Sequence, residues 1–223
     1  MPRHDRTRLC IVCTFYFAFR SVLISARSIG ESLLDSVRRV RCAEAFAHET
    51  AHAFGRIDGL CNAAGITTRG TLLDTTPKLF DTHIAVNLRG PFFAMQAAVA
   101  DMVERHTAGS IVNILSIAAH GGQGYLAPYV AAKAGLAGLT RNAAHAHRWD
   151  RIRINGLNIG WTESEGETQT QRSFHHADDD WATAAAKKLP MGKLGQPDEI
   201  AEIVVLLLSP RSGVVTGSVI DWD

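Results

Sequence analysis

Two patterns of apolar and polar positions in the sequence predict its strands and helices. Short apolar runs rich in β-branched residues are typical of buried strands, whereas longer alanine-rich stretches predict helices. Strands are expected at 9–17, 21–25, within 55–65, and at 110–115, 151–160 and 214–221. Helices are expected at 37–54, 81–95 and 129–147, and from Pro197 onward. The polar segment 163–189 is expected to be an irregular lid over a substrate. Strands and helices therefore alternate, as in an α/β protein.

The length and composition limit the possible classes. A chain of 223 residues suits one domain, 1–223, with a well-buried core. A net charge of +1 argues against an electrostatic nucleic-acid binder, and the apolar run 9–19 is too short to span a bilayer. We therefore expect a cytoplasmic protein without nucleic-acid or membrane partners. A secretory or organelle signal at the basic, apolar start, cleaved near Ser25 and Ala26, is the alternative.

Two short patterns near the N-terminus raise the question of a metal site. Cys10 and Cys13 form a Cys-x-x-Cys pair, but no second pair with zinc-like spacing follows. Residues 48–52 read His-Glu-Thr-Ala-His and match His-Glu-x-x-His, a pattern that can bind zinc. A catalytic zinc site needs a third protein ligand, and no glutamate occurs between Glu49 and Glu104. We expect no metal and reduced, structural cysteines, with a zinc hydrolase as a competing hypothesis.

The segment from Ser116 to Lys133 carries the most specific chemical pattern. Ser116 follows the predicted strand 110–115, and Tyr129 and Lys133, four positions apart, share one face of the next helix. An ammonium beside a phenol lowers its pKa from about 10, which makes the phenol a usable general acid or base. Ser116 lies where open α/β sheets place their ligands. Tyr-x-x-x-Lys alone is a weak pattern, so the specificity comes from the strand, the serine and the intervening glycines.

With this context the chain resembles the short-chain dehydrogenase/reductase family over residues 37–223. The resemblance implies a doubly wound, Rossmann-like parallel sheet with helices on both faces. It also implies that Ser116, Tyr129 and Lys133 are catalytic. Asn87, in Ala-Val-Asn-Leu-Arg-Gly, matches a family asparagine that supports a helix irregularity and a proton-relay water.

The resemblance further implies how a nicotinamide cofactor, NAD or NADP, is held. One segment is similar to the family's Asn-Asn-Ala-Gly turn, whose small residues let the backbone approach the cofactor. A second segment follows the strand 151–160 and matches the family's Pro-Gly turn and the hydroxyl that holds the carboxamide and phosphate. The cofactor-binding candidates are Asn62, Ala63, Ala64, Gly65, Tyr129, Lys133, Gly160, Thr162 and Ser164.

The alanine-rich segments 91–102 and 129–146 correspond to helices through which the family forms oligomers. Small side chains allow close packing of helices from two copies. The resemblance therefore implies a homodimer or a homotetramer.

The resemblance largely disappears before Val37. Dinucleotide-binding enzymes place a glycine-rich turn after the first strand, and this family's version is Thr-Gly-x-x-x-Gly-x-Gly. The first 54 residues contain one glycine, Gly30. A βαβ unit takes roughly 30 residues or more, and 59 residues precede Leu60, so the first βαβ part is expected to be incomplete. Residues 1–36 form a divergent or truncated segment, in which Arg27 would favour NADP through a match too weak to choose the cofactor.

Two functional hypotheses follow. The first is an NAD(P)-dependent oxidoreductase that interconverts an alcohol and a carbonyl on a small molecule, similar to 3-oxoacyl-carrier-protein reductases or polyol dehydrogenases. The second is a noncatalytic or truncated relative that keeps the core but does not bind the dinucleotide. The residues from Ser116 to Lys133 favour the first hypothesis, and the missing glycine-rich turn favours the second.

Overall fold

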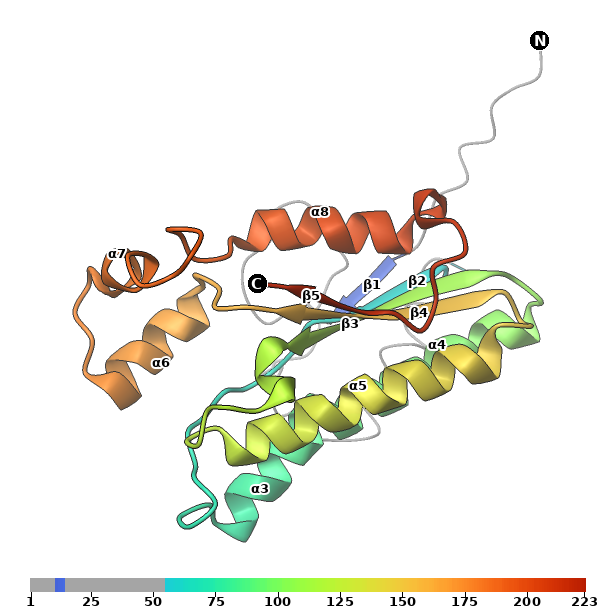
Figure 1. The fold of residues 1–223 in the computed structure, drawn as a ribbon. Helices are drawn as coiled ribbons and strands as arrows, with labels where there is room; N and C mark the ends of the chain where they lie inside the picture. Colours follow the sequence, from blue (N-terminus) through green and yellow to red (C-terminus); the bar gives the residue numbers. More distant parts are fainter. Residues whose placement is uncertain (1–10, 15–54) are drawn as a thin grey trace.

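The computed structural model describes residues 11–14 and 55–223, which form a parallel sheet between two layers of helices (Figure 1). Within this part of the chain the sheet has five strands in the order β1-β2-β3-β4-β5, all parallel to their neighbours. The strands are β1 (Ile11–Thr14), β2 (Gly59–Asn62), β3 (Gly109–Ser116), β4 (Ile152–Ile159) and β5 (Val219–Trp222). The predicted α/β, doubly wound architecture is confirmed.

Helices cover both faces of the sheet. Figure 1 shows α8 (Pro197–Leu208) on one face and α4 (Gly90–Glu104) and α5 (Ala127–His147) on the other. One cluster of buried side chains joins α4 and α5 to the sheet, and a second joins α8 to the opposite face. Burial of these apolar surfaces on both faces stabilises the sheet, as is usual for parallel strands.

Local sequence signals explain where the long helices begin. In α5, Pro128 stands in the first turn, where its missing N–H costs no hydrogen bond. In α8, Gln196 and Glu199 form a capping box, and Asp198 and Glu199 place acids near the positive end of the helix. The helix predicted from Pro197 is therefore confirmed.

The predicted helix 81–95 is interrupted. It consists of α3 (Pro77–Ile84), the π-helix η1 (Ala85–Arg89) and α4 in direct succession. Insertions of this kind widen one helical turn and often mark functional sites.

Two boundaries differ from the prediction. Segment 163–189 is not irregular, because it holds α6 (Glu165–His175) and α7 (Trp181–Ala186), which lie beyond the end of β4 (Figure 1). The sequence of α6 is mostly polar, and its start is fixed by Ser164, which accepts a hydrogen bond from the Glu167 N–H. The last strand begins at Val219 rather than Val214, after the left-handed Gly217 at φ 74°.

The N-terminal expectations are met only in part by the described residues. β1 falls within the predicted strand 9–17 and pairs with β2, which is the place of the first strand in the doubly wound order 3-2-1-4-5-6. The strand expected at 21–25 and the helix expected at 37–54 lie outside the described residues.

Candidate functional site

The end of β3 positions the first candidate residue. Ser116 is the last residue of the strand, and its Oγ accepts a hydrogen bond from the Ala118 N–H at 3.2 Å. This bond starts the short 3-10 helix η2 (Ile117–His120), which turns the chain away from the sheet. The Ser116 side chain also acts on the Tyr129 phenol, whose pKa it lowers against the larger effect of burial. The serine therefore stands at the carboxyl edge of the sheet, where ligands of open α/β sheets bind.

Helix α5 brings Tyr129 and Lys133 to the same edge. Their side chains lie one turn apart and are nearly closed off from solvent, with exposed fractions of 7% and 4%. The Lys133 Nζ donates a hydrogen bond of 2.7 Å to the Ile114 carbonyl on β3 and lies 5.8 Å from the centre of the Tyr129 ring. The structure thus brings Ser116, Tyr129 and Lys133 together, as their spacing predicts.

The protonation equilibria of this pair differ from the sequence-based expectation. Burial raises the pKa of Tyr129 to about 12, against a smaller lowering effect of the hydrogen bond with Ser116. Burial also lowers the pKa of Lys133 to about 8. The expected lowering of the tyrosine pKa is therefore wrong for this state of the protein. Removal from water disfavours both charged forms, and the lysine does not offset that effect on the phenol.

Asn87 lies in the π-helix η1 and is fully buried. Its Oδ1 accepts from the Ile66 N–H at 2.9 Å, and its Nδ2 donates to the Ile66 carbonyl at 3.0 Å. A Cβ at Gly65 would lie 3.1 Å from Asn87 Oδ1 and 3.7 Å from Lys133 Nζ. The amide therefore fixes the backbone that follows Gly65, and this glycine leaves the space between Asn87 and Lys133 open. The helix irregularity at the asparagine, which the family resemblance implies, is present.

His83 belongs to the same network, although the sequence pattern did not single it out. Its ring is fully buried, and Nε2 donates to the Thr68 carbonyl at 3.0 Å, so Nδ1 accepts from Asn87 Nδ2 at 3.1 Å. Burial lowers the pKa of His83, against a smaller raising effect of the bond to Thr68. The position of His83, four residues before Asn87 on one helical face, was the available signal.

The candidate turn after β2 is anchored in the core. Asn62 is buried and donates through Nδ2 to Asn113 Oδ1 at 2.8 Å, and Asn113 in turn donates to Thr140 Oγ1 on α5 at 2.9 Å. Ala63, Ala64 and Gly65 follow, which brings the chain to the Asn87 amide. The turn is therefore held at both ends by buried amide side chains.

The candidates after β4 line the approach to α6. The Gly160 N–H donates to the Trp222 carbonyl, and a Cβ at Gly160 would lie 2.0 Å from Asp223 Oδ1. Thr162 Oγ1 donates to the Gly160 carbonyl at 3.1 Å, while Ser164 caps α6. Both hydroxyls therefore shape the turn and the start of the helix.

The competing zinc hypothesis concerns residues that the structure does not describe, so only other metal sites can be sought. Over 11–14 and 55–223, no three His, Cys, Asp or Glu side chains gather as a metal site would require, and this includes the stretch from His175 to Asp180. The His-Glu-x-x-His pattern at 48–52, Cys10, Cys42 and Arg27 lie outside the described residues. Among the helices that are described, none is long and apolar enough to cross a membrane.

A buried tyrosine, lysine and serine at the carboxyl edge of a doubly wound sheet define a class of dinucleotide-dependent α/β proteins, and comparisons with known proteins narrow this class. The sequence profile of the family described as Enoyl-(Acyl carrier protein) reductase matches residues 27–223. The chain belongs to the short-chain dehydrogenase/reductase family, a family of NAD(P)-dependent oxidoreductases.

Individual relatives agree with this assignment. The chain is 37% identical to 2-(S)-hydroxypropyl-CoM dehydrogenase 3 of Xanthobacter autotrophicus, over 76% of this chain and 66% of that protein. It is 36% identical to inactive 2-(S)-hydroxypropyl-CoM dehydrogenase 2 of the same organism, over 77% and 74%. The crystal structure of a levodione reductase matches with a TM-score of 0.78 and 32% identity, over 84% of this chain and 73% of that one. The chain thus spans slightly less than two thirds of the first relative's length.

The described residues leave room for the nicotinamide half of the family's NAD(P) cofactor. Gly65 leaves room beside the Lys133 amine, and Asn87 fixes the adjoining backbone, as a nicotinamide ribose bound there would need. The pyrophosphate half differs, because no glycine occurs between Thr14, where β1 ends, and Gly30. Glycines at that turn normally let the backbone N–H groups reach the pyrophosphate.

Proposed function

We propose that this chain is an oxidoreductase that interconverts an alcohol and a carbonyl on a small molecule with NAD or NADP. The observation that carries the proposal is the convergence of Ser116, Tyr129 and Lys133 at the end of β3, with the tyrosine and lysine buried one turn apart. A phenol kept protonated by its surroundings is a proton donor, and a buried amine beside it is a cation poised to change protonation near neutral pH.

The roles we assign to these residues are those that the family resemblance implies, and their positions support them. During reduction the Tyr129 hydroxyl donates its proton to the carbonyl oxygen of the substrate, while the Ser116 hydroxyl donates a hydrogen bond to the same oxygen. The Lys133 ammonium stabilises the phenolate that remains. Asn87 keeps the turn after Gly65 in place and connects Lys133 to solvent through a water. The bound nicotinamide supplies the hydride or accepts it in the reverse direction.

We assign the cofactor contacts to three places. Tyr129 and Lys133 hold the ribose, the turn 62–65 faces the nicotinamide side, and Gly160, Thr162 and Ser164 face the carboxamide and phosphate. The proposal covers NAD and NADP alike. It also includes a cytoplasmic location for the protein.

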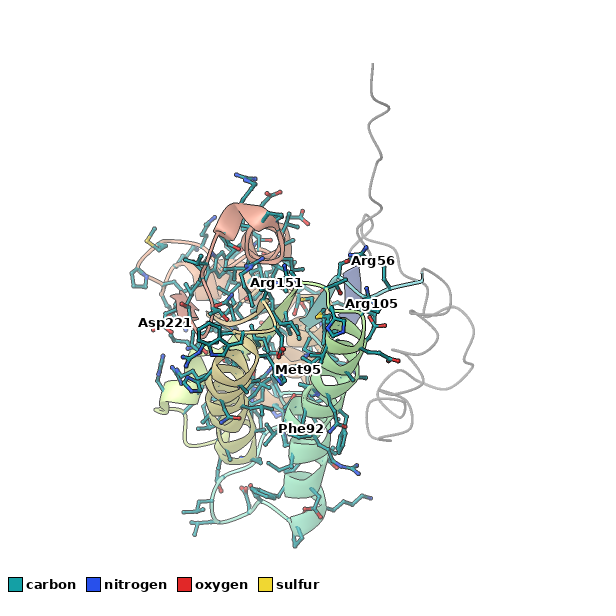
Figure 2. The ribbon with its side chains drawn as sticks, turned by 90° about the vertical axis from the view of Figure 1, so that its right-hand side faces the viewer. Arg56, Phe92, Met95, Arg105, Arg151 and Asp221 are labelled. Carbon is teal, nitrogen blue, oxygen red and sulfur yellow. The ribbon has the colours of Figure 1, made fainter. Side chains whose placement is uncertain are left out.

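We further propose that the protein works as a homodimer or homotetramer through α4 and α5. These helices lie side by side on one face of the molecule (Figures 1 and 2). Their exposed positions include small or apolar residues, Phe92, Ala100 and Val103 on α4 and Ala131, Ala134, Gly135 and Gly138 on α5. Polar residues are exposed beside them: Gln96, Glu104, Arg141, Asn142 and His145. Such faces allow close contact between the helices of two copies.

The test is a titration of the purified protein with NADH and with NADPH, followed by nicotinamide and tryptophan fluorescence. Trp161 is partly exposed at the end of β4 and reports binding near the nicotinamide. Saturable binding, followed by turnover that Tyr129→Phe abolishes without loss of the fold, is the expected result. Near-normal turnover in the Tyr129→Phe variant would contradict the assigned role.

A second candidate function is a noncatalytic relative that does not bind the dinucleotide. The scarcity of glycine in the first 54 residues favours it. The relative named as inactive matches as closely as the one named as a dehydrogenase, so overall similarity does not separate the two candidates. A folded protein that binds neither NADH nor NADPH would establish this second reading.

A further inference from the structure

Arg69, in the loop after β2, joins that loop to helix α6. Arg69 Nε donates to His175 Nε2 at 3.2 Å, and Arg69 Nη2 lies 3.8 Å from Glu167 Oε1. Because an arginine nitrogen only donates, the His175 nitrogen is the acceptor. Glu167 and His175 are eight positions apart, so they lie on one face of α6, two turns from each other. Arg69 therefore contacts both halves of the helix.

The arginine itself is held by the body of the protein. Its Nη1 donates to the Thr67 carbonyl at 2.9 Å, and its guanidinium lies 5.2 Å from the centre of the Tyr125 ring. The next residue, Gly70, donates to the Tyr125 carbonyl and accepts from the Ala127 N–H. These bonds place Arg69 against the segment that leads directly into Tyr129. Tyr125 also meets the His175 ring edge to face, at 5.6 Å.

Glu167 extends this connection to the turn after β4. Its Oε1 accepts from Trp161 Nε1 at 2.9 Å and from Gln171 Nε2 at 2.7 Å. The Trp161 ring in turn packs on Trp181 of α7 at 6.0 Å. The side chains of Arg69 and Glu167 are mostly buried, with exposed fractions of 14% and 15%, so their attraction is less screened than that of a surface pair. Arg69 is therefore connected to α6 through Glu167, and to α7 through Glu167, Trp161 and Trp181.

We propose that Arg69 is a positioning residue that clasps α6 over the Tyr129 site and so sets the strength of substrate binding. The inference rests on the function proposed above, because it treats α6 as the lid of that site. The charges of the clasp reach the reacting group: after the dominant effect of burial and the bond to Ser116, Glu167 raises the pKa of Tyr129 and Arg69 lowers it. The backbone bonds of Gly70 to Tyr125 and Ala127 join the clasp to the start of α5, two residues before Tyr129.

The test compares Arg69→Ala and Arg69→Lys with Arg172→Ala. Arg172 is also on α6, but it pairs only with the exposed Asp179 in the described part of the chain, so it is a matched control for loss of an arginine. Amide hydrogen exchange of 165–175, measured by mass spectrometry, reports opening of the helix without any need for activity. We expect Arg69→Ala to speed exchange about tenfold, as for loss of one charge-assisted hydrogen bond. The Arg172→Ala variant should exchange like the wild type.

Steady-state kinetics then separates clasping from chemistry. We expect KM for the substrate to rise about tenfold in Arg69→Ala while kcat changes little, because the lid contributes binding that is the same in ground and transition states. Arg69→Lys keeps the charge but lacks the forked guanidinium that reaches His175. Its KM should therefore lie between those of the wild type and Arg69→Ala. Unchanged exchange in Arg69→Ala, or a loss in kcat at constant KM, would overturn the clasp. If the protein proves inactive, the exchange experiment still decides the inference.

Discussion

Lys133 carries its amine into a site from which water is almost excluded, and this has a thermodynamic consequence. Its pKa falls from 10.5 to about 8 through burial, which corresponds to roughly 3 kcal/mol of disfavoured charge. Below pH 8 the amine is charged in both the folded and the unfolded chain, so the full penalty is present at neutral pH. Between about pH 8 and 10.5 the unfolded state binds more protons than the folded state, so stability rises with pH.

We therefore predict that Lys133→Met is more stable than the wild type at pH 7, by about 1–3 kcal/mol after loss of the bond to the Ile114 carbonyl. The same variant should be inactive. Urea unfolding at pH 7 and pH 9.5 measures the free energy of unfolding of both proteins. The stability gained by Lys133→Met should shrink at the higher pH, because the amine of the folded wild type is then largely neutral. Lys188→Met, at an exposed position, is the control. A less stable Lys133→Met at pH 7 would refute this account.

At the residue scale the sequence predicts positions better than energies. Ser116, Tyr129 and Lys133 were found because a strand end and two residues four apart on a helix are local properties of the chain. The pKa of Tyr129 was predicted in the wrong direction, because it depends on burial by distant segments. The sequence pattern did not identify His83 and Arg69 as site residues, for a similar reason. Each acts through a backbone or side-chain partner that only the fold brings near.

At the element scale, apolar periodicity located most of the described strands and helices but not their interruptions. β3 and β4 match the predicted strands within a residue or two, because buried parallel strands leave a clear apolar run. The π-helix at Asn87 and the helices α6 and α7 were not predicted from periodicity. The first depends on a buried amide that bonds the Ile66 backbone. Helix α6 forms on a polar sequence with Ser164 as its cap, whereas α7 is a short segment without a side-chain cap.

Ser164 carries two assignments that a substitution can separate. The structure shows it as the cap of α6, and the proposed function gives its hydroxyl a contact with the cofactor phosphate. Aspartate caps a helix as well as serine does. We predict that Ser164→Asp retains the hydrogen-exchange protection of α6 but weakens NAD(P)H binding about tenfold or more, since the added charge repels the phosphate.

Fluorescence titration measures that affinity, and Ser164→Ala serves as the comparison that lowers helix protection without adding charge. If Ser164→Asp binds NAD(P)H with an unchanged dissociation constant, Ser164 caps α6 but does not contact the cofactor phosphate.

At the scale of the whole molecule, the described residues supply most of a doubly wound sheet and the side of the site to which we assign the nicotinamide. Residues 55–223 contribute four of the five described strands, and β1 adds the strand that would precede the pyrophosphate turn. The sequence itself shows what is unusual here, because the residues that follow Thr14 contain no glycine until Gly30. Binding of the dinucleotide therefore tests the arrangement of the entire chain rather than that of one residue.

The proposed oligomerisation through α4 and α5 also belongs to the scale of the whole molecule. Phe92 lies on α4 (Figure 2) and is 41% exposed. Its ring packs edge to face with that of Phe93, and the ring centres are 5.1 Å apart. An aromatic ring exposed on a helix face is a typical anchor of a protein interface. We predict that the wild-type protein is a dimer or tetramer and that Phe92→Arg dissociates it, because a buried, unpaired charge at the contact is strongly unfavourable.

Light scattering coupled to size-exclusion chromatography measures the mass of each species directly. Met191→Arg is the matched control, because Met191 is also exposed but lies in the loop between α7 and α8, away from the α4 and α5 face. We expect it to keep the wild-type mass. A monomeric wild type, or a Phe92→Arg variant of unchanged mass, would show that this face is not the interface. Loss of activity on dissociation would further mean that contact across these helices helps to hold α5, and with it Tyr129 and Lys133, in place.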